Sequence, residues 1–267
     1  MAEVNRPIFL LSDFGLASAF AGQVRAVIAG IAPGASVIDL AHDVSPFAVE
    51  EGAWLLETSL AVLPPGAVVM AVVDPGVGGA RRELVVASGG HLFVGPDNGL
   101  LSAAFGDRLP GGTRPETDVR ELCSPQFRRP HVSPTFHGRD IFAPAAAHLA
   151  NGVDYRLLGP PLGDATIFPA FAATPGEHGE LGGRVVHIDR FGNLITTIRP
   201  AQLFPRFVIE AGGAAVDSHV RTFSDAPEGV PFCYADSSGF IAIAVNEGSA
   251  AETIGLRRGD PVTVRAR

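Results

Sequence analysis

The chain has 267 residues, enough for one large domain or two ordinary ones, and a formal net charge of −8. All 20 of its lysine-plus-arginine residues are arginine, which excludes a Walker A phosphate loop and a lysine Schiff base. Basic residues cluster no more densely than in pairs of arginines, so we expect no binding of nucleic acid.

Two further patterns bear on where the protein works. No uncharged apolar run approaches the roughly 20 residues that span a bilayer, and the start of the chain lacks the pattern of a signal peptide. The two cysteines, Cys123 and Cys233, are too few for a disulfide framework or a zinc motif. We therefore expect a cytoplasmic protein with reduced thiols and no membrane association.

The first part of the chain alternates between strand and helix patterns. Short apolar runs predict strands, and apolar residues at helical spacing between them predict helices, one of which opens at Ser45-Pro46. This order predicts a parallel α/β sheet with right-handed crossovers. The predicted strands are 7–13, 36–40 and 67–73, and the predicted helices are 18–32 and 45–60.

The pattern changes along the rest of the chain. Residues 83–88 and 91–94 predict a hairpin, 106–134 predict no clear element, and Thr135 can cap a helix over 136–149. Short β-type runs without a convincing helix follow a Gly- and Pro-rich stretch, which predicts a small barrel or sandwich. We predict an α/β domain at 1–165, a linker at 166–182 and a barrel-like all-β domain at 183–267. The runs are 184–189, 194–198, 206–210, 214–222, 231–234, 240–245 and 261–265.

The stretch VVDPGVGGARR at 72–82 is the most informative part of the sequence. Its Asp74 ends a buried strand, and open α/β sheets bind ligands at the carboxyl ends of their strands. Arg81 or Arg82 could fold back and hold this carboxylate ionised. A surface turn with a structural Asp–Arg pair explains these residues equally well. A dinucleotide loop does not, because a strand rather than a helix follows the glycines.

Three other polar clusters accompany this stretch, at 12–15, 135–140 and 189–193. Each has an ordinary explanation, since a single histidine such as His137 is more often structural than catalytic. A divalent metal held by His137, Asp74 and Asp97 lacks a supporting ligand spacing, so we expect no metal site.

Taken together and in order, these clusters resemble the S-adenosyl-L-methionine (SAM) hydroxide adenosyltransferases, or SAM hydrolases, which are relatives of the fluorinases and chlorinases. The resemblance covers nearly the whole chain, and so many ordered matches are specific where one alone is not. The matching segments are SDFG at 12–15, PFAVEEGA at 46–53, VVDPGVGGARR at 72–82, VGPDNGLL at 94–101, TFHGRDIFAPAAAHLA at 135–150, IDRFGNLITTI at 188–198 and NEGSAAE at 246–252.

The resemblance implies an α/β domain followed by a β domain, and a homotrimer that binds SAM between the first domain of one subunit and the second domain of its neighbour. SAM would be the substrate, adenosine and L-methionine the products, and no cofactor would be needed. An Asp-Arg-His set would direct water at the ribose C5′ atom. These three roles fall on Asp74, Arg81 and His137, and either Asp74 or His137 could take the proton from water.

The resemblance also assigns substrate contacts. Asp13 matches the acid that holds the ribose hydroxyls, and Phe47 falls where an aromatic ring lies against the nucleoside. The second-domain segment that meets methionine and adenine falls on Asp189, Phe191 and Asn193, and Ser237 falls near a contact to the methionine carboxylate.

The sequence departs from the family pattern at two places. Ser18 stands where many relatives carry a second acid, and Ser12 replaces a common threonine. Two alternatives to a hydrolase stay open, a halogenase on the same scaffold and a non-catalytic sensor of SAM or adenosine. A carboxylate at Asp74 would repel halide, and an intact Asp74, Arg81 and His137 set favours catalysis over sensing.

Overall fold

The computed structural model describes residues 5–106 and 116–267 of the chain. It divides into two compact units, Met1–Pro169 and Ala170–Arg267. The dividing point falls inside the stretch predicted as a linker, 166–182. The last residues of that stretch are not linker in conformation, because Thr174–Pro175 (β7) pairs with Leu181–Ile188 (β8) of the second unit.

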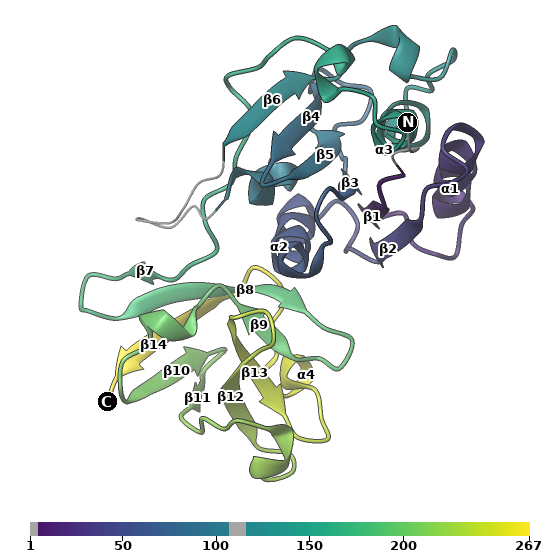
Figure 1. The fold of residues 1–267 in the computed structure, drawn as a ribbon. Coiled ribbons are helices and arrows are strands. Elements are labelled where there is room, and N and C mark those ends of the chain that lie inside the picture. Colours follow the sequence, from purple (N-terminus) through teal and green to yellow (C-terminus); the bar gives the residue numbers. More distant parts are fainter. Residues whose placement is uncertain (1–4, 107–115) are drawn as a thin grey trace. The chain divides into compact units, whose positions relative to one another are not determined.

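The first unit is built on six strands, which are Ile8–Ser12 (β1), Val37–Ala41 (β2), Val68–Val72 (β3), Glu83–Ser88 (β4), His91–Pro96 (β5) and Thr117–Glu121 (β6). They form one sheet in the order β2-β1-β3-β5-β4-β6 (Figure 1). The pairs β2-β1, β1-β3 and β3-β5 are parallel, and β4 pairs antiparallel with β5 and β6. The predicted mostly parallel sheet is thus confirmed, with an antiparallel edge.

Helices cover both faces of this sheet, as Figure 1 shows. Along β1 the side chains of Ile8 and Leu10 pack with Phe20–Ile31 (α1) and Ala143–Ala150 (α3). The alternate residues Phe9 and Leu11 belong to a second core on the other face, with Val49–Ser59 (α2). Because side chains alternate across a strand, a continuous apolar run supplies both layers.

Two helices differ from the sequence prediction in ways that shape the site. α2 begins at Val49 rather than at Ser45-Pro46, because Phe47 has a left-handed backbone with φ 66°. The helix predicted over 136–149 opens instead with one π-helical turn, Gly138–Phe142, and α3 follows it. Pro144 stands in the first turn of α3 and has no N–H to continue an α-helical pattern backwards.

The second unit is an antiparallel, barrel-like sheet, so the predicted fold class is confirmed there too. Its strands follow the order β11-β10-β14-β8-β9-β13-β12 (Figure 1). The apolar core lies within this sheet and includes Val185, Ile209, Ile243 and Val264. Besides β7 and β8, the strands are Leu194–Thr196 (β9), Phe207–Ala211 (β10), Ala214–Val216 (β11), Pro231–Ala235 (β12), Ile241–Val245 (β13) and Pro261–Ala266 (β14).

Three local predictions for the later part of the chain need correction. A short helix, Ala250–Ile254 (α4), is present where none was expected, with the side chain of Ser249 capping it. The strand predicted over 214–222 is shorter, ending at Val216. The region 106–134, for which no element was predicted, contains β6 and a 3₁₀ turn at Pro125–Phe127, while 107–115 lie outside the described residues.

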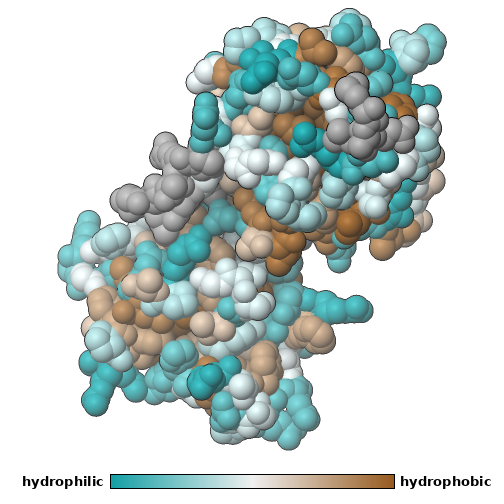
Figure 2. All heavy atoms as spheres, in the orientation of Figure 1, coloured by the Kyte–Doolittle hydropathy of each residue, from teal (hydrophilic) through white to brown (hydrophobic). Residues whose placement is uncertain are grey.

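The surface mixes hydrophilic and hydrophobic residues on the face shown in Figure 2. None of the helices in the described ranges has both the length and the apolar character required to cross a membrane.

Candidate active site

Two carboxylates meet at the carboxyl ends of neighbouring strands. Asp13 directly follows β1, and Asp74 follows β3 by two residues, where the parallel register sets Ser12 opposite Val72. Both acids line a pocket of about 170 Å³. The rest of the lining comes from the segments after β1, after β3 and before α3, and from Phe47: Phe14, Phe47, Val72, Val77, Thr135, Phe136, His137 and Gly138.

Arg81 closes the loop after β3 by donating hydrogen bonds to both carboxylate oxygens of Asp74. Its Nε donates to Oδ1 at 3.0 Å and its Nη2 donates to Oδ2 at 2.5 Å. Burial by itself would lower the pKa of Arg81, but the hydrogen bonds to Asp74 and Glu83 outweigh it, so the pKa is raised. The guanidinium therefore keeps its charge, and its hydrogen bonds fix the orientation of the Asp74 side chain.

The neighbouring arginine serves a different pair. Arg82 donates to Asp97 at 2.6 Å and to Asp164 at 2.7 Å, away from the pocket. The structure thus assigns the fold-back contact to Arg81, the arginine that the family resemblance implied and that the local pattern alone left open. The trio of His137, Asp74 and Asp97 does not meet, and among the described residues no group of three or more His, Cys, Asp or Glu side chains could hold a metal ion.

Glu83 is a member of the site that the sequence reasoning missed. The Nη1 of Arg81 donates to its Oε1 at 2.8 Å, and the Nη2 of Arg128 lies 3.3 Å from its Oε2. A signal was present, because Arg81 and Glu83 are two residues apart at the start of a strand, where such side chains share a face. The guanidinium of Arg81 therefore lies between two carboxylates.

His137 completes the cluster from the other side of the pocket. The Nη2 of Arg81 lies 2.9 Å from its Nδ1, and the Oε1 of Glu83 lies 3.1 Å from the same atom. Burial lowers the pKa of His137, and the charge of Arg81 lowers it further. The imidazole is therefore neutral at pH 7.

A close backbone contact brings His137 and the loop after β3 together. Gly78 has φ 73°, and a Cβ atom on it would lie 2.2 Å from the carbonyl oxygen of Pro134. Only glycine fits both constraints. Asp140, fully buried, then fixes the segments on both sides of His137 by accepting from Ser133 N at 2.9 Å and from Arg139 Nε at 2.7 Å.

Asp13 and Phe47 are joined at the rim of the pocket. The backbone N–H of Phe47 donates to Asp13 Oδ2 at 3.1 Å, which holds Phe47 in its strained left-handed conformation. Phe47 is 73% exposed. Burial raises the pKa of Asp13, and the nearby charge of Asp74 adds to this effect. The exposed ring is thus available to a ligand.

The second unit holds the other predicted substrate residues. Asp189 Oδ1 accepts from the backbone of Phe191 and Asn193, and Asp189 Oδ2 accepts from Asn193 Nδ2 at 2.7 Å. Asp189, Phe191 and Asn193 line a hollow of about 660 Å³ together with Phe223 and Tyr234. Ser237 is not part of its lining and lies in the turn between β12 and β13.

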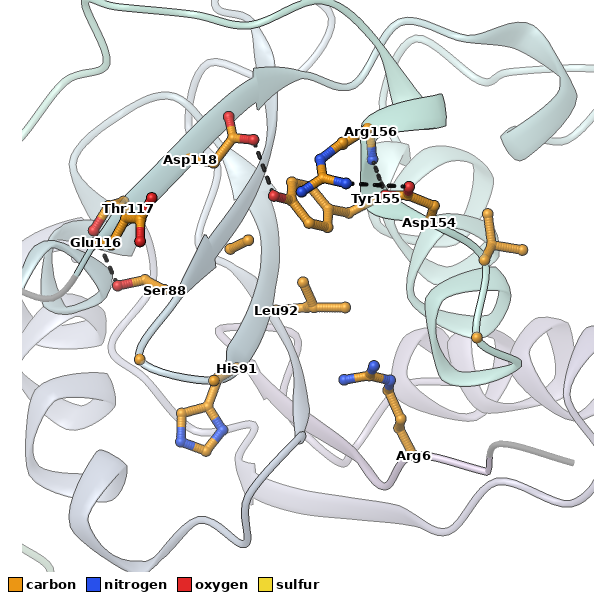
Figure 3. Close-up of a pocket in the computed structure, with 15 residues that line it drawn as sticks. Arg6, Ser88, His91, Leu92, Glu116, Thr117, Asp118, Asp154, Tyr155 and Arg156 are labelled. Carbon is orange, nitrogen blue, oxygen red and sulfur yellow. Dashed lines mark hydrogen bonds and ion pairs between the residues drawn. The ribbon is translucent and has the colours of Figure 1, made fainter. Parts of the chain in front are cut away.

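A larger hollow of about 700 Å³ lies at the amino-terminal edge of the first sheet (Figure 3). Two of its acids are already paired, since Tyr155 donates to Asp118 at 3.0 Å and Arg156 lies 3.6 Å from Asp154. Arg6 lines this hollow and precedes β1, whereas Asp13 follows β1. The hollow therefore lies at the opposite edge of the sheet from Asp13 and Asp74. We therefore take the smaller pocket, with its interlocked charged groups, as the candidate active site.

Comparison with known proteins matches both units to one family. A model of the SAM hydroxide adenosyltransferase N-terminal domain matches residues 8–159, and a model of the C-terminal domain matches residues 183–263. The chain belongs to the SAM hydroxide adenosyltransferase family. The resemblance inferred from the sequence is thereby confirmed.

Individual proteins are also similar to this chain over almost its full length. An "(R)-S-adenosyl-L-methionine hydrolase" of Thermus thermophilus is 45% identical over 261 residues, which are 96% of this chain and 98% of that protein. A "Fluorinase" of Actinopolyspora mzabensis is 27% identical over 97% of each chain. The crystal structure of an uncharacterized conserved protein from Thermotoga maritima superposes with a TM-score of 0.86 at 31% identity, over 97% of this chain and 100% of that one.

Proposed function

We propose that this protein hydrolyses SAM to adenosine and L-methionine at the pocket beside Asp74. The observation that carries the proposal is the continuous set of contacts in which Arg81 joins Asp74 to His137, two residues that both line the pocket. Sequence relatives named as (R)-S-adenosyl-L-methionine hydrolases, at 45% and 41% identity, support the same reaction.

The residues present suit the chemistry of a sulfonium leaving group. The C5′–S bond breaks with its electron pair moving to sulfur, so methionine leaves neutral and needs no general acid. The enzyme must place water in line with that bond, and positioning is the main source of rate. A nearby base that takes the water proton adds a factor of about 10²–10⁴. The acids Asp13 and Asp74 also complement a cationic substrate.

The substrate contacts assigned by resemblance are part of this proposal. The exposed ring of Phe47 and the carboxylate of Asp13 offer a stacking surface and an acceptor for the ribose hydroxyls. Phe191 and Asn193 offer the same kinds of contact in the second unit. The homotrimer with sites at its subunit interfaces, the cytoplasmic location and the Ser237 contact stay predictions.

One experiment separates the candidate reactions. The purified protein is incubated with SAM, once without halide and once in excess chloride, and the nucleosides are separated by chromatography with mass detection. Adenosine and methionine in both samples are the expected result. A chlorinated nucleoside would show a halogenase instead, and intact SAM in both samples would show a sensor or a different adenosyl substrate.

A further inference from the structure

Glu83 contacts the candidate catalytic arginine, Arg81, and also Arg128 and His137. Arg81 uses its Nε and Nη2 edge for Asp74 and its Nη1 for Glu83, so the two carboxylates grip the guanidinium from different edges. Arg128 holds the second oxygen of Glu83 at 3.3 Å and also donates to the carbonyl of Leu122. The Glu83 side chain is only 13% exposed and is held by both arginines. It can therefore fix the position of the Arg81 guanidinium.

The Nδ1 atom of His137 faces a donor and an acceptor at nearly the same distance. Arg81 Nη2 lies 2.9 Å away and can only donate, whereas Glu83 Oε1 lies 3.1 Å away and, when ionised, can only accept. A single ring nitrogen cannot satisfy both at once. The neutral ring accepts from Arg81 through Nδ1 and carries its proton on Nε2, whereas the protonated ring donates from Nδ1 to Glu83.

We propose that Glu83 is a positioning residue, which holds Arg81 against Asp74 and accepts from His137 when the imidazole is protonated. This inference rests on the proposed function and deepens it. In the active, neutral form His137 offers an Nε2–H donor to the attacking water, and the proton of that water passes to the carboxylate of Asp74 and then to solvent. When His137 is protonated at low pH, its Nδ1 donates to Glu83 instead of accepting from Arg81. The hydrogen bond between Arg81 and His137 is then lost.

The charges that face His137 set the direction of the expected effect. Arg81 disfavours the imidazolium, whereas Glu83 and Asp74 favour it, and Asp13 lies across the same pocket. Replacing Glu83 by glutamine removes one favourable charge, so His137 should need a lower pH to become protonated. The acid limb of the pH profile for kcat should move in the same direction.

The test uses Glu83→Gln, with Glu121→Gln on the neighbouring strand β6 as the matched control. Nuclear magnetic resonance of ¹⁵N-histidine-labelled protein without SAM follows the titration and tautomer of His137. We expect the Nε2–H tautomer in the unmodified chain, and a titration lower by about half a pH unit or more in Glu83→Gln. We also expect kcat to fall about tenfold while KM for SAM changes less than about twofold.

Two results would overturn the proposal, whatever happens to activity. One is an unchanged His137 titration in Glu83→Gln, and the other is an Nδ1–H tautomer in the unmodified chain. Glu83→Asp keeps the charge, so its His137 should titrate closer to the unmodified chain than that of Glu83→Gln does. Glu121→Gln should change neither the His137 titration nor kcat. Because the resonance readout needs no substrate, it tests the contact between Glu83 and His137 even in a chain that fails to convert SAM, so failure of the proposed function and failure of this contact are distinguishable.

Discussion

At the scale of single residues, the site depends on the Asp74 carboxylate being held in one orientation by Arg81. Asp74 is 5% exposed and Arg81 is 10% exposed, and each satisfies the other. Removing one partner of such a buried pair leaves the other uncompensated, which costs more than the net contribution of the pair. Effects of substitution here must therefore be separated into binding, turnover and stability.

Asp74→Ala should leave SAM binding measurable and lower turnover at least about a hundredfold, because the water loses its carboxylate partner and Arg81 loses its orientation. Calorimetric titration with SAM and the rate of adenosine release measure the two effects. Asp74→Asn, which keeps the shape of the side chain, is the control for packing. Unchanged turnover in Asp74→Ala would remove this residue from the mechanism.

A histidine away from the pocket gives a prediction on pH and stability. His42 Nδ1 lies 2.7 Å from Ser12 Oγ, and burial, followed by the charge of Arg25, lowers the pKa of His42. The unfolded chain then binds more protons than the folded one, so this contribution is complete above the ordinary histidine pKa and is lost as pH falls below it. The melting temperature should fall from pH 7.5 to 5.5.

His42→Asn should weaken that pH dependence, because one titrating group is removed. Thermal unfolding followed by circular dichroism at a series of pH values measures it. Since burial also lowers the pKa of His91 and His148, part of the dependence should persist in the variant. An identical slope in both proteins would show that His42 does not contribute.

At the scale of elements, the site is formed by the segments that follow strands β1 and β3 and precede helix α3. β1 and β3 deliver Asp13 and Asp74 to one edge, and the π-helical turn before α3 presents His137 to the same pocket. Gly78 allows the loop after β3 to touch the chain at Pro134. The distance between Arg81 and His137 therefore depends on a backbone contact and not only on side chains.

Gly78→Ala should lower turnover at least about tenfold and destabilise the protein by more than about 1 kcal/mol, because an added Cβ meets the carbonyl of Pro134. Gly89→Ala is the matched control, since Gly89 also has a positive φ but open space around it. Urea unfolding and adenosine release measure both variants. Equal losses in the two would mean that backbone strain, not the contact, is responsible.

At the scale of the whole molecule, the predicted substrate contacts are divided between two units. Asp13 and Phe47 belong to the first unit, and Asp189, Phe191 and Asn193 belong to the second. Each unit has its own core, so each can present its residues rigidly. The resemblance predicts that a complete site uses the first unit of one subunit and the second unit of another.

Co-expression of Asp74→Ala and Phe191→Ala chains tests this arrangement. If sites form between subunits of a trimer, random mixing should restore about one quarter of the wild-type number of intact sites. If each site lies within one subunit, the mixture should be no more active than the two variants apart. Light scattering of the purified protein gives the number of subunits.

The sequence by itself determined the fold class, the order of most elements and the family. Strands can be predicted from apolar runs bounded by turn residues, because a strand that is buried on both faces, such as β3, must be apolar throughout. The sequence also indicated the candidate site at Asp74, because an acid that ends a buried parallel strand stands at a known ligand edge.

Tertiary structure alone decided which groups meet there. The local pattern could not choose between Arg81 and Arg82, because both lie in the same loop and only packing directs their side chains; the choice of Arg81 came from the family resemblance alone. Sequence reasoning missed Glu83, whose importance lies in reaching His137 across 54 positions of sequence, and it missed the left-handed Phe47 that delays α2. These contacts join segments distant in the chain, so their energies exist only once the sheet has brought its strand ends together.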